Sequence, residues 1–171
     1  MMLGKKRVTL ERLRELLRYD PWTGRFFWLV ARSNIQAGME AGTVLKDHNC
    51  TYMRLCIDGH RYSAHHLVWL YANGEWPSSH IDHIDVNGLN NRIDNLRLAT
   101  TAENTRNSRL SRRNTSGFKG VTYDRWRCRW KSAIKVIGKS RHLGYFDTPE
   151  AAHAAYRAAA KNHFGEFARF E

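Results

Sequence analysis

Cysteine is scarce in this sequence, and its few copies are not spaced as a metal site or a redox pair. The 171 residues contain three cysteines, Cys50, Cys56 and Cys128, and no CxxC motif. Three cysteines cannot all pair within one chain, which argues against a disulfide framework and against a cysteine-rich zinc site. We therefore expect a reducing, cytoplasmic location, with Cys50 and Cys56 buried as small apolar residues.

Long apolar segments are also missing. The apolar runs are only a handful of residues long, too short to cross a bilayer, so no membrane partner is expected. The opening Met-Met-Leu-Gly-Lys-Lys lacks the apolar stretch of a signal peptide. Aromatic residues make up 12% of the chain and apolar residues 42%, which argues against disorder. The length fits one ordinary domain or two to three small modules.

Acidic residues almost disappear from part of the second half. Residues 105–145 hold one acid, Asp124, against twelve basic side chains, whereas the rest of the chain has 16 basic and 15 acidic residues. The twelve are Arg106, Arg109, Arg112, Arg113, Lys119, Arg125, Arg127, Arg129, Lys131, Lys135, Lys139 and Arg141. This concentration of charge predicts a polyanionic partner. The alternative is a solvated basic surface without a ligand.

The first segment, residues 1–64, has the pattern of a helix followed by a small antiparallel sheet. Thr9 is the expected N-cap of a helix that runs to residue 18 and carries its leucines on one face. Short strands are predicted at 25–30, 41–45, 51–57 and 60–64. The dipeptide Asp58-Gly59 predicts a tight hairpin turn between the last two strands.

The second segment, residues 65–108, places a polar run between short regular elements. A helix is predicted at 65–72, closed by Asn73-Gly74, and a strand at 96–99. Thr100 and Glu103 form a capping box, so another helix should begin there.

The remaining residues divide into a basic linker, 109–116, and a third segment, 117–171. Strands are predicted at 120–124, 126–136 and 141–146, and Thr148-Pro149 should open a final helix as its cap and first residue. The whole chain is therefore predicted to be an α+β protein made of small antiparallel sheets and helices.

The run from Ser79 to Arg97 carries the residue types that phosphodiester hydrolysis requires. It packs histidine, carboxylate and amide side chains into a turn-rich stretch between two short strands. A neutral imidazole can take a proton from water, and hard oxygen ligands can hold a divalent cation against a phosphate. Such ligands suit Mg²⁺, with Mn²⁺ as a substitute, and no zinc or small-molecule cofactor is expected.

The spacing within this run resembles that of the HNH, or ββα-metal, endonucleases of phages and mobile elements. Asp82 and His83 are followed by Asn95 twelve residues after the histidine, and by Asn104 nine residues later. The runs Tyr-Asp-Pro-Trp-Thr-Gly at 19–24 and Gly-Glu-Trp-Pro at 74–77 also resemble that group, so the likeness covers residues 9–108. It implies an HNH nuclease core at 65–108 with a hairpin, a following helix and a divalent metal ion.

The resemblance also implies roles for four residues. His83 matches the general base that activates water, and Asp82 and Asn104 match the metal ligands. Asn95 matches the asparagine that holds the hairpin loop and orients the histidine. Asn107, one helical turn later, is a weaker rival to Asn104 as the ligand. A separate interpretation makes Asp85, Asn87, Asn90, Asn91 and Asp94 plain turn or capping residues.

A second likeness lies in the basic third segment. If residues 125–131 are one strand, Arg125, Arg127, Arg129 and Lys131 share one face, and Trp126, Cys128 and Trp130 share the other. The segment, and above all Leu-Gly-Tyr-Phe-Asp-Thr at 143–148, resembles an AP2 domain over residues 117–168. That likeness implies a three-stranded sheet that is backed by one helix and reads DNA. The alternative is an exposed basic sheet face without a ligand.

Together these patterns predict a site-directed, metal-dependent DNA endonuclease of the homing or mobile-element type. The expected partner is double-stranded DNA, and the protein would act as a monomer or homodimer, in the host-cell cytosol if a phage encodes it. The candidate DNA contacts are all of the twelve basic residues except Lys139. One alternative is a DNA-binding regulator with an inactive nuclease core, and another is a nuclease without sequence preference.

Overall fold

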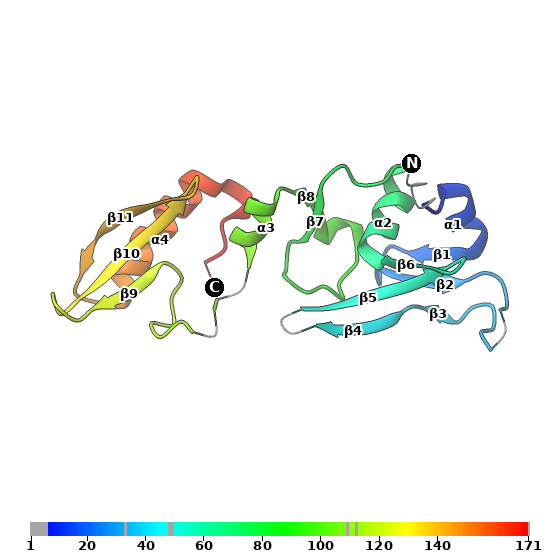
Figure 1. Cartoon of the computed structure of the whole chain (residues 1–171), viewed down its shortest axis with the longest axis horizontal. Helices are drawn as coiled ribbons and strands as arrows, with labels where there is room; N and C mark the ends of the chain where they lie inside the picture. Colours follow the sequence, from blue (N-terminus) through cyan, green and yellow to red (C-terminus); the bar gives the residue numbers. More distant parts are fainter. Residues whose placement is uncertain (1–6, 33, 48–49, 109, 112, 171) are drawn as a thin grey trace, which may run out of the picture. The chain divides into compact units, whose positions relative to one another are not determined.

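The computed structural model describes residues 7–32, 34–47, 50–108, 110–111 and 113–170. The chain divides into two compact units, Met1–Thr100 and Thr101–Glu171. Figure 1 gives the elements of each unit. Within the described residues, no helix is long and apolar enough to cross a membrane.

The first unit contains two helices, a 3-10 turn and three small antiparallel sheets. In chain order its elements are α1 (Leu10–Leu16), β1 (Leu17–Asp20), β2 (Arg25–Trp28), β3 (Glu40–Ala41), β4 (Thr43–Asp47), β5 (Cys50–Ile57), β6 (His60–Ser63), α2 (Ala64–Asn73), β7 (His80–His83), η1 (Ile93–Asn95) and β8 (Leu96–Ala99). The sheets have the orders β1-β2-β3, β4-β5-β6 and β7-β8.

The first helix begins as predicted but ends earlier. Thr9 caps α1, and its hydroxyl accepts a hydrogen bond from the backbone N–H of Arg12. The helix stops at Leu16 because the next four residues form β1, in which Leu17 pairs with Trp28. Leu17 and Tyr19 are buried and Arg18 between them is exposed, an alternation of period two that marks a strand.

The strand predicted at 41–45 is two strands in different sheets. Gly42 separates β3 from β4 with φ of +119°, and a Cβ there would lie 2.7 Å from Sδ of Met53. Other turn predictions are confirmed: Asp58 and Gly59 both have positive φ between β5 and β6, and Gly74 ends α2 in the left-handed conformation. Cys56, expected to be buried, is exposed, as is Cys50, because both lie on solvent-facing positions of β5.

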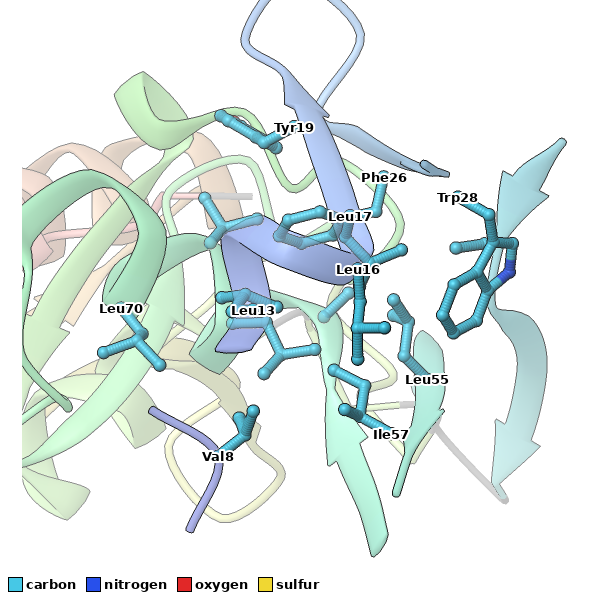
Figure 2. Packing of buried hydrophobic residues seen from close by; sticks show 14 of the residues in the cluster. Val8, Leu13, Leu16, Leu17, Tyr19, Phe26, Trp28, Leu55, Ile57 and Leu70 are labelled. Carbon is cyan, nitrogen blue, oxygen red and sulfur yellow. The ribbon is translucent and has the colours of Figure 1, made fainter. Parts of the chain in front are cut away.

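The core of the first unit joins residues from both the first and the second predicted segment. Figure 2 shows its α1, β1 and β5 side chains, among them Leu13, Leu17 and Leu55, which are almost completely buried. Ile81 of β7 and Leu96 of β8 belong to the same cluster. The hairpin that carries the proposed catalytic residues is therefore packed on the same core as the N-terminal helix.

The second unit is a three-stranded antiparallel sheet covered on one face by a helix, as the sequence predicts. Its elements are α3 (Thr101–Asn107), β9 (Val121–Asp124), β10 (Arg129–Val136), β11 (Lys139–Phe146), α4 (Pro149–Phe164) and η2 (Gly165–Phe167), and the sheet order is β11-β10-β9. Ile134 packs on Tyr156 and Ala160 of α4. A Cβ at Gly120 would overlap the Tyr156 ring, so glycine permits this close packing.

Both helices of the second unit begin where the sequence predicts. Thr148 caps α4, and its hydroxyl accepts a hydrogen bond from the Ala151 N–H, with Pro149 as the first helical residue. The helix α3 begins directly after Thr100. It is tied to its own unit by Lys119, whose Nζ donates to the carbonyls of Arg106 and Ser108 at 2.7 and 2.8 Å.

The predicted long strand at 126–136 is wrong in its first part. Residues 125–128 form a turn, and Cys128 has φ of +51°, so β10 begins only at Arg129. The turn is held by Asp124, whose carboxylate accepts hydrogen bonds from the N–H groups of Trp126 and Arg127. Trp126, predicted to share a strand face with Cys128 and Trp130, instead lies in this turn and is 98% exposed.

Candidate active site and nucleic-acid interface

The hairpin β7–β8 places Asp82 and His83 at the end of a strand. In its register, Asp82 lies opposite Arg97 and His83 opposite Leu96. Ile81 and Leu96 point into the core and fix the hairpin on the unit below it. The backbone positions of Asp82 and His83 are therefore set by regular pairing rather than by a mobile loop.

Asp82 is held by an ion pair that is largely removed from solvent. Its Oδ2 accepts from Nε and Nη2 of Arg97 at 3.0 and 2.9 Å. The side chain of Asp82 is 5% exposed and that of Arg97 is 12% exposed. Arg97 thus orients the carboxylate and balances its charge at a position largely removed from water.

The imidazole of His83 is oriented by Asn91, a residue that the sequence interpretation assigns only to a turn. Nε2 of His83 lies 3.1 Å from Oδ1 of Asn91. The Asn91 amide is itself oriented, because its Nδ2 donates to the carbonyl of Leu89 at 3.3 Å. Since an amide Oδ1 can only accept, a hydrogen bond at this contact requires the N–H on Nε2, which leaves Nδ1 as the ring nitrogen that can accept a proton.

His65 contacts the other side of this site, and sequence reasoning did not single it out. Its ring meets that of His83 edge-to-face, with centroids 5.2 Å apart, and lies 4.5 Å from that of His66. Burial, with smaller effects of His66 and His83, lowers the pKa of His65 to about 3. Its buried Nδ1 has no hydrogen-bond partner among the described residues. His65 is therefore a neutral ring at the base of the site.

The loop between β7 and β8 is held together by Asn95. Its Nδ2 donates to Oδ1 of Asp85 at 2.9 Å and to the carbonyl of Asn90 at 2.8 Å. Its Oδ1 accepts from the Asp85 N–H at 3.1 Å, and its carbonyl accepts from the Ile84 N–H at 2.9 Å. Asn95 is buried, so these bonds form away from water. This geometry suits the loop-holding role that the HNH resemblance implies.

Tyr19 and Gly24, from another part of the first unit, pack against this loop. The hydroxyl of Tyr19 donates to the Asn91 carbonyl at 3.0 Å and accepts from the Ile93 N–H at 3.1 Å. Gly24 lies so close that a Cβ there would be 2.6 Å from the backbone of both Asn91 and Arg92. The turn between β1 and β2 is therefore packed directly on the loop that orients His83.

The two predicted metal ligands belong to different units, Asp82 to the first and Asn104 to the second. The Asp82 carboxylate and the Asn104 amide both offer hard oxygen atoms, and neither involves a thiolate. Asn104 is exposed on α3 and Asn107 is buried. Within the residues that the structure describes, no three His, Cys, Asp or Glu side chains gather as a metal cluster.

The structure places only part of the predicted basic strand face on β10. Arg129, Lys131 and Lys135 alternate with buried residues and face solvent, on the side of the sheet opposite α4. Arg127 reaches the same side from the preceding turn, with its guanidinium 4.9 Å from the centroid of Tyr145, which pairs with Lys131. We call Arg127, Arg129, Lys131 and Lys135 the basic sheet face.

The acids near this face are few but present. Arg129 donates to Oδ1 of Asp147 at 2.7 Å, and Arg127 lies 3.5 Å from the Asp124 carboxylate. Exposed pairs of this kind contribute little and exchange readily for other anions.

The other candidate contacts are dispersed. Arg141 pairs with buried Ile134 and so belongs to the helix-covered side of the sheet, and the Nζ of Lys119 already caps α3. Burial lowers the pKa of Lys119. Arg106 stacks on Phe164 with its guanidinium 4.5 Å from the ring centroid. Arg113 and Arg125 are exposed, and Arg109 and Arg112 lie outside the described residues.

Comparisons with known proteins point to one family. The sequence profile of HNH endonucleases matches residues 62–106, the stretch from the end of β6 into α3. The chain is similar to Protein 3.8 of Escherichia phage T7, with 41% identity over 107 residues, 62% of this chain and 88% of that protein. It is also similar to an uncharacterized HNH endonuclease, L560, of Acanthamoeba polyphaga mimivirus, with 34% identity over 152 residues, 87% of this chain and 70% of that protein. No solved structure matches the chain.

Proposed function

Because this chain belongs to the HNH endonuclease family, we propose that it hydrolyses DNA phosphodiester bonds with the help of a divalent metal ion. The observation that carries the proposal is the oriented imidazole of His83, which follows the buried Asp82 directly at the end of β7. A histidine with a fixed tautomer next to a hard oxygen ligand is what water activation at a phosphate requires.

In the proposed reaction His83 is the general base. The Nε2 N–H of His83 donates a hydrogen bond to Oδ1 of Asn91, and Nδ1 is the atom that accepts the proton of the attacking water. His65 packs on the His83 ring as a neutral partner and adds no competing charge. Asn95 keeps the loop closed around Asn91 and thereby maintains the orientation of the base.

Asp82 and Asn104 are proposed to hold the metal ion, with Arg97 orienting Asp82. Mg²⁺, or Mn²⁺ in its place, supplies Lewis-acid stabilisation of the charge that develops on the phosphate. Asp82→Ala and Asn104→Ala should each abolish cleavage. If Asn107→Ala is far more damaging than Asn104→Ala, the ligand has been assigned one turn too early on α3.

We further propose that the second unit selects the DNA. Its sheet and helix have the architecture that the AP2 resemblance implies, and its basic sheet face presents cations away from α4. A protein with such a separate recognition surface is suited to site-directed cutting of the homing or mobile-element type. In a phage-encoded protein this would occur in the host cytosol, by a monomer that nicks or a homodimer that cuts both strands.

The proposal is tested by cleavage of supercoiled plasmid carrying candidate target DNA. Cutting should require Mg²⁺ and stop in EDTA, and His83→Ala should lower the rate by about 10² or more while duplex binding persists. His60→Ala, at an exposed position at the start of β6, is the matched control and should cut at the wild-type rate. Undiminished cutting by His83→Ala, or in EDTA, would remove this mechanism.

A further inference from the structure

An exposed tryptophan stands on the turn that packs against the catalytic loop. Trp22, between β1 and β2 (Figure 1), is 81% exposed. Two residues later, Gly24 is buried against the backbone of Asn91 and Arg92, and Asn91 is the residue that orients His83. The indole is therefore carried by the same rigid body as the proposed general base.

The turn itself is fixed by Asp20. One carboxylate oxygen accepts from the Trp22 N–H at 3.0 Å, and the other accepts from the hydroxyl of Thr23 at 2.7 Å. The Asp20 carbonyl accepts from the Gly24 N–H at 2.8 Å. These bonds hold the Trp22 backbone in place while its large apolar side chain remains in water, an arrangement that contributes nothing to the core.

The surface around the turn suits a polyanion. Arg18, two residues before Asp20, is exposed on β1, and its guanidinium lies 5.1 Å from the centroid of the Phe27 ring on β2. Arg25 begins β2 and is also exposed, and its guanidinium forms an exposed ion pair with Glu40 at 2.8 Å, a kind of pair that a phosphate can replace. A rigid aromatic side chain flanked by arginines matches the two parts of a duplex, stacked bases and phosphates.

We propose that Trp22 contacts duplex DNA beside the scissile phosphate and inserts its indole against a base step. The inference rests on the proposed nuclease function, since it makes the DNA held at His83 the partner of Trp22. Apolar side chains that insert between base steps unstack them and bend the duplex, which here would present the phosphate to the hairpin. Trp22 is then a substrate-contacting residue in addition to Asp82, His83, Asn95 and Asn104.

The test compares Trp22→Ala and Trp22→Phe with Leu29→Ala, a control that truncates another exposed apolar residue of the first unit. On a plasmid that the wild-type protein cuts, Trp22→Ala should cut about tenfold more slowly. Trp22→Phe should retain most of the rate, and Leu29→Ala should be unaffected. Matching thermal melting curves for the variants will show that the fold is intact.

A second measurement reports on unstacking directly. In the His83→Ala background, duplexes with 2-aminopurine next to the mapped cut should brighten on binding, and this increase should disappear when Trp22 is also alanine. Wild-type cutting by Trp22→Ala with the same fluorescence increase would overturn the inference, leave the nuclease function standing, and favour a protein partner for the indole. Failure of the wild-type protein to cut any candidate target would overturn both.

Discussion

Several side chains together orient the imidazole ring of His83. Asn91 fixes its Nε2, His65 packs against its face or edge as a neutral ring, and Tyr19 and Gly24 brace the backbone of Asn91. Because each contact is a single interaction of ordinary length, the orientation of the base depends on their sum rather than on any dominant bond.

Asn91→Ala should lower the cleavage rate about 10- to 100-fold at unchanged DNA affinity, because it removes the acceptor that fixes the His83 tautomer. Asn87→Ala is the matched control: Asn87 lies in the same loop and accepts from the Leu89 N–H, but it does not hold His83. Single-turnover cleavage and equilibrium binding measure the two effects. Equal losses for both variants would mean that general disturbance of the loop, and not the lost acceptor, lowers the rate.

His65 should make the stability of the protein sensitive to acid. Burial lowers the pKa of His65 from 6.5 to about 3. Below pH 6.5 the His65 side chain is therefore protonated in the unfolded chain but stays neutral in the folded chain until the pH approaches 3. Stability from this group is therefore complete above pH 6.5 and is lost as the pH falls toward 3. At pH 5 the loss amounts to about 2 kcal/mol.

Urea unfolding at pH 7.5 and pH 5 measures this effect. The free energy of unfolding should fall between pH 7.5 and pH 5, and this fall should be about 2 kcal/mol smaller in His65→Gln than in the wild-type protein. His60→Gln, at an exposed position, should leave the difference unchanged. An unaltered difference in His65→Gln would show that His65 is protonated in the folded state.

Among the elements, β10 has one face that is covered by α4 and another that carries basic side chains to solvent. Its register puts Lys131 opposite Tyr145 on the solvent side, and Ile134 opposite Arg141 on the side covered by α4. The pairing shifts between Ser132 and Ala133, and the rings of His142 and Tyr145 meet at a tilt with their centroids 4.6 Å apart. The face proposed to contact DNA is thus a cationic strand beside aromatic rings.

Lys131→Ala combined with Lys135→Ala should weaken duplex binding, and the slope of log K against log salt should fall by about one for each lost phosphate contact. Arg141→Ala removes one positive charge from the helix-covered side of the same sheet and should weaken binding less than either lysine variant alone. Fluorescence anisotropy at several salt concentrations, in the His83→Ala background, provides both quantities. Equal effects at all three positions would mean that total charge, rather than this face, binds the DNA.

In the whole molecule, the β7–β8 hairpin, which carries the proposed catalytic residues, and the basic sheet face belong to different units. The hairpin is built on the core shared by α1, β5 and α2, whereas the basic sheet face stands on a core of its own with α4. The excess positive charge lies in residues 105–145, all within the second unit. Binding and cutting should therefore be separable by truncation.

A fragment of residues 101–171 should bind duplex DNA with an affinity that falls steeply as salt rises, and it should not cut. The fragment begins at α3 because Lys119 and Phe164 hold that helix within the second unit. Far-ultraviolet circular dichroism establishes its folding, and anisotropy its binding. A folded fragment without affinity for DNA at low salt would show that its charge is only a solvated surface.

Local chemistry in the sequence was sufficient for most elements and for the motif residues. The Asp58-Gly59 turn, the Gly74 helix end and the Thr148-Pro149 helix start are all confirmed, because each depends on residues adjacent in the chain. The identities of Asp82, His83, Asn95 and Asn104 likewise follow from fixed spacing, and their roles in catalysis stay predictions.

Tertiary structure decided what surrounds these residues. Leu17 leaves α1 because it pairs with Trp28, and the exposed Arg141 lies on the α4 side of the sheet because its register pairs it with Ile134. His65 meets His83 through the packing of α2 near the hairpin. Periodicity and propensity describe neighbours along the chain, whereas these contacts join residues of different elements. Residues 125–128 turn because the Asp124 carboxylate accepts from two following N–H groups, a local contact that the alternation of basic and apolar residues did not indicate.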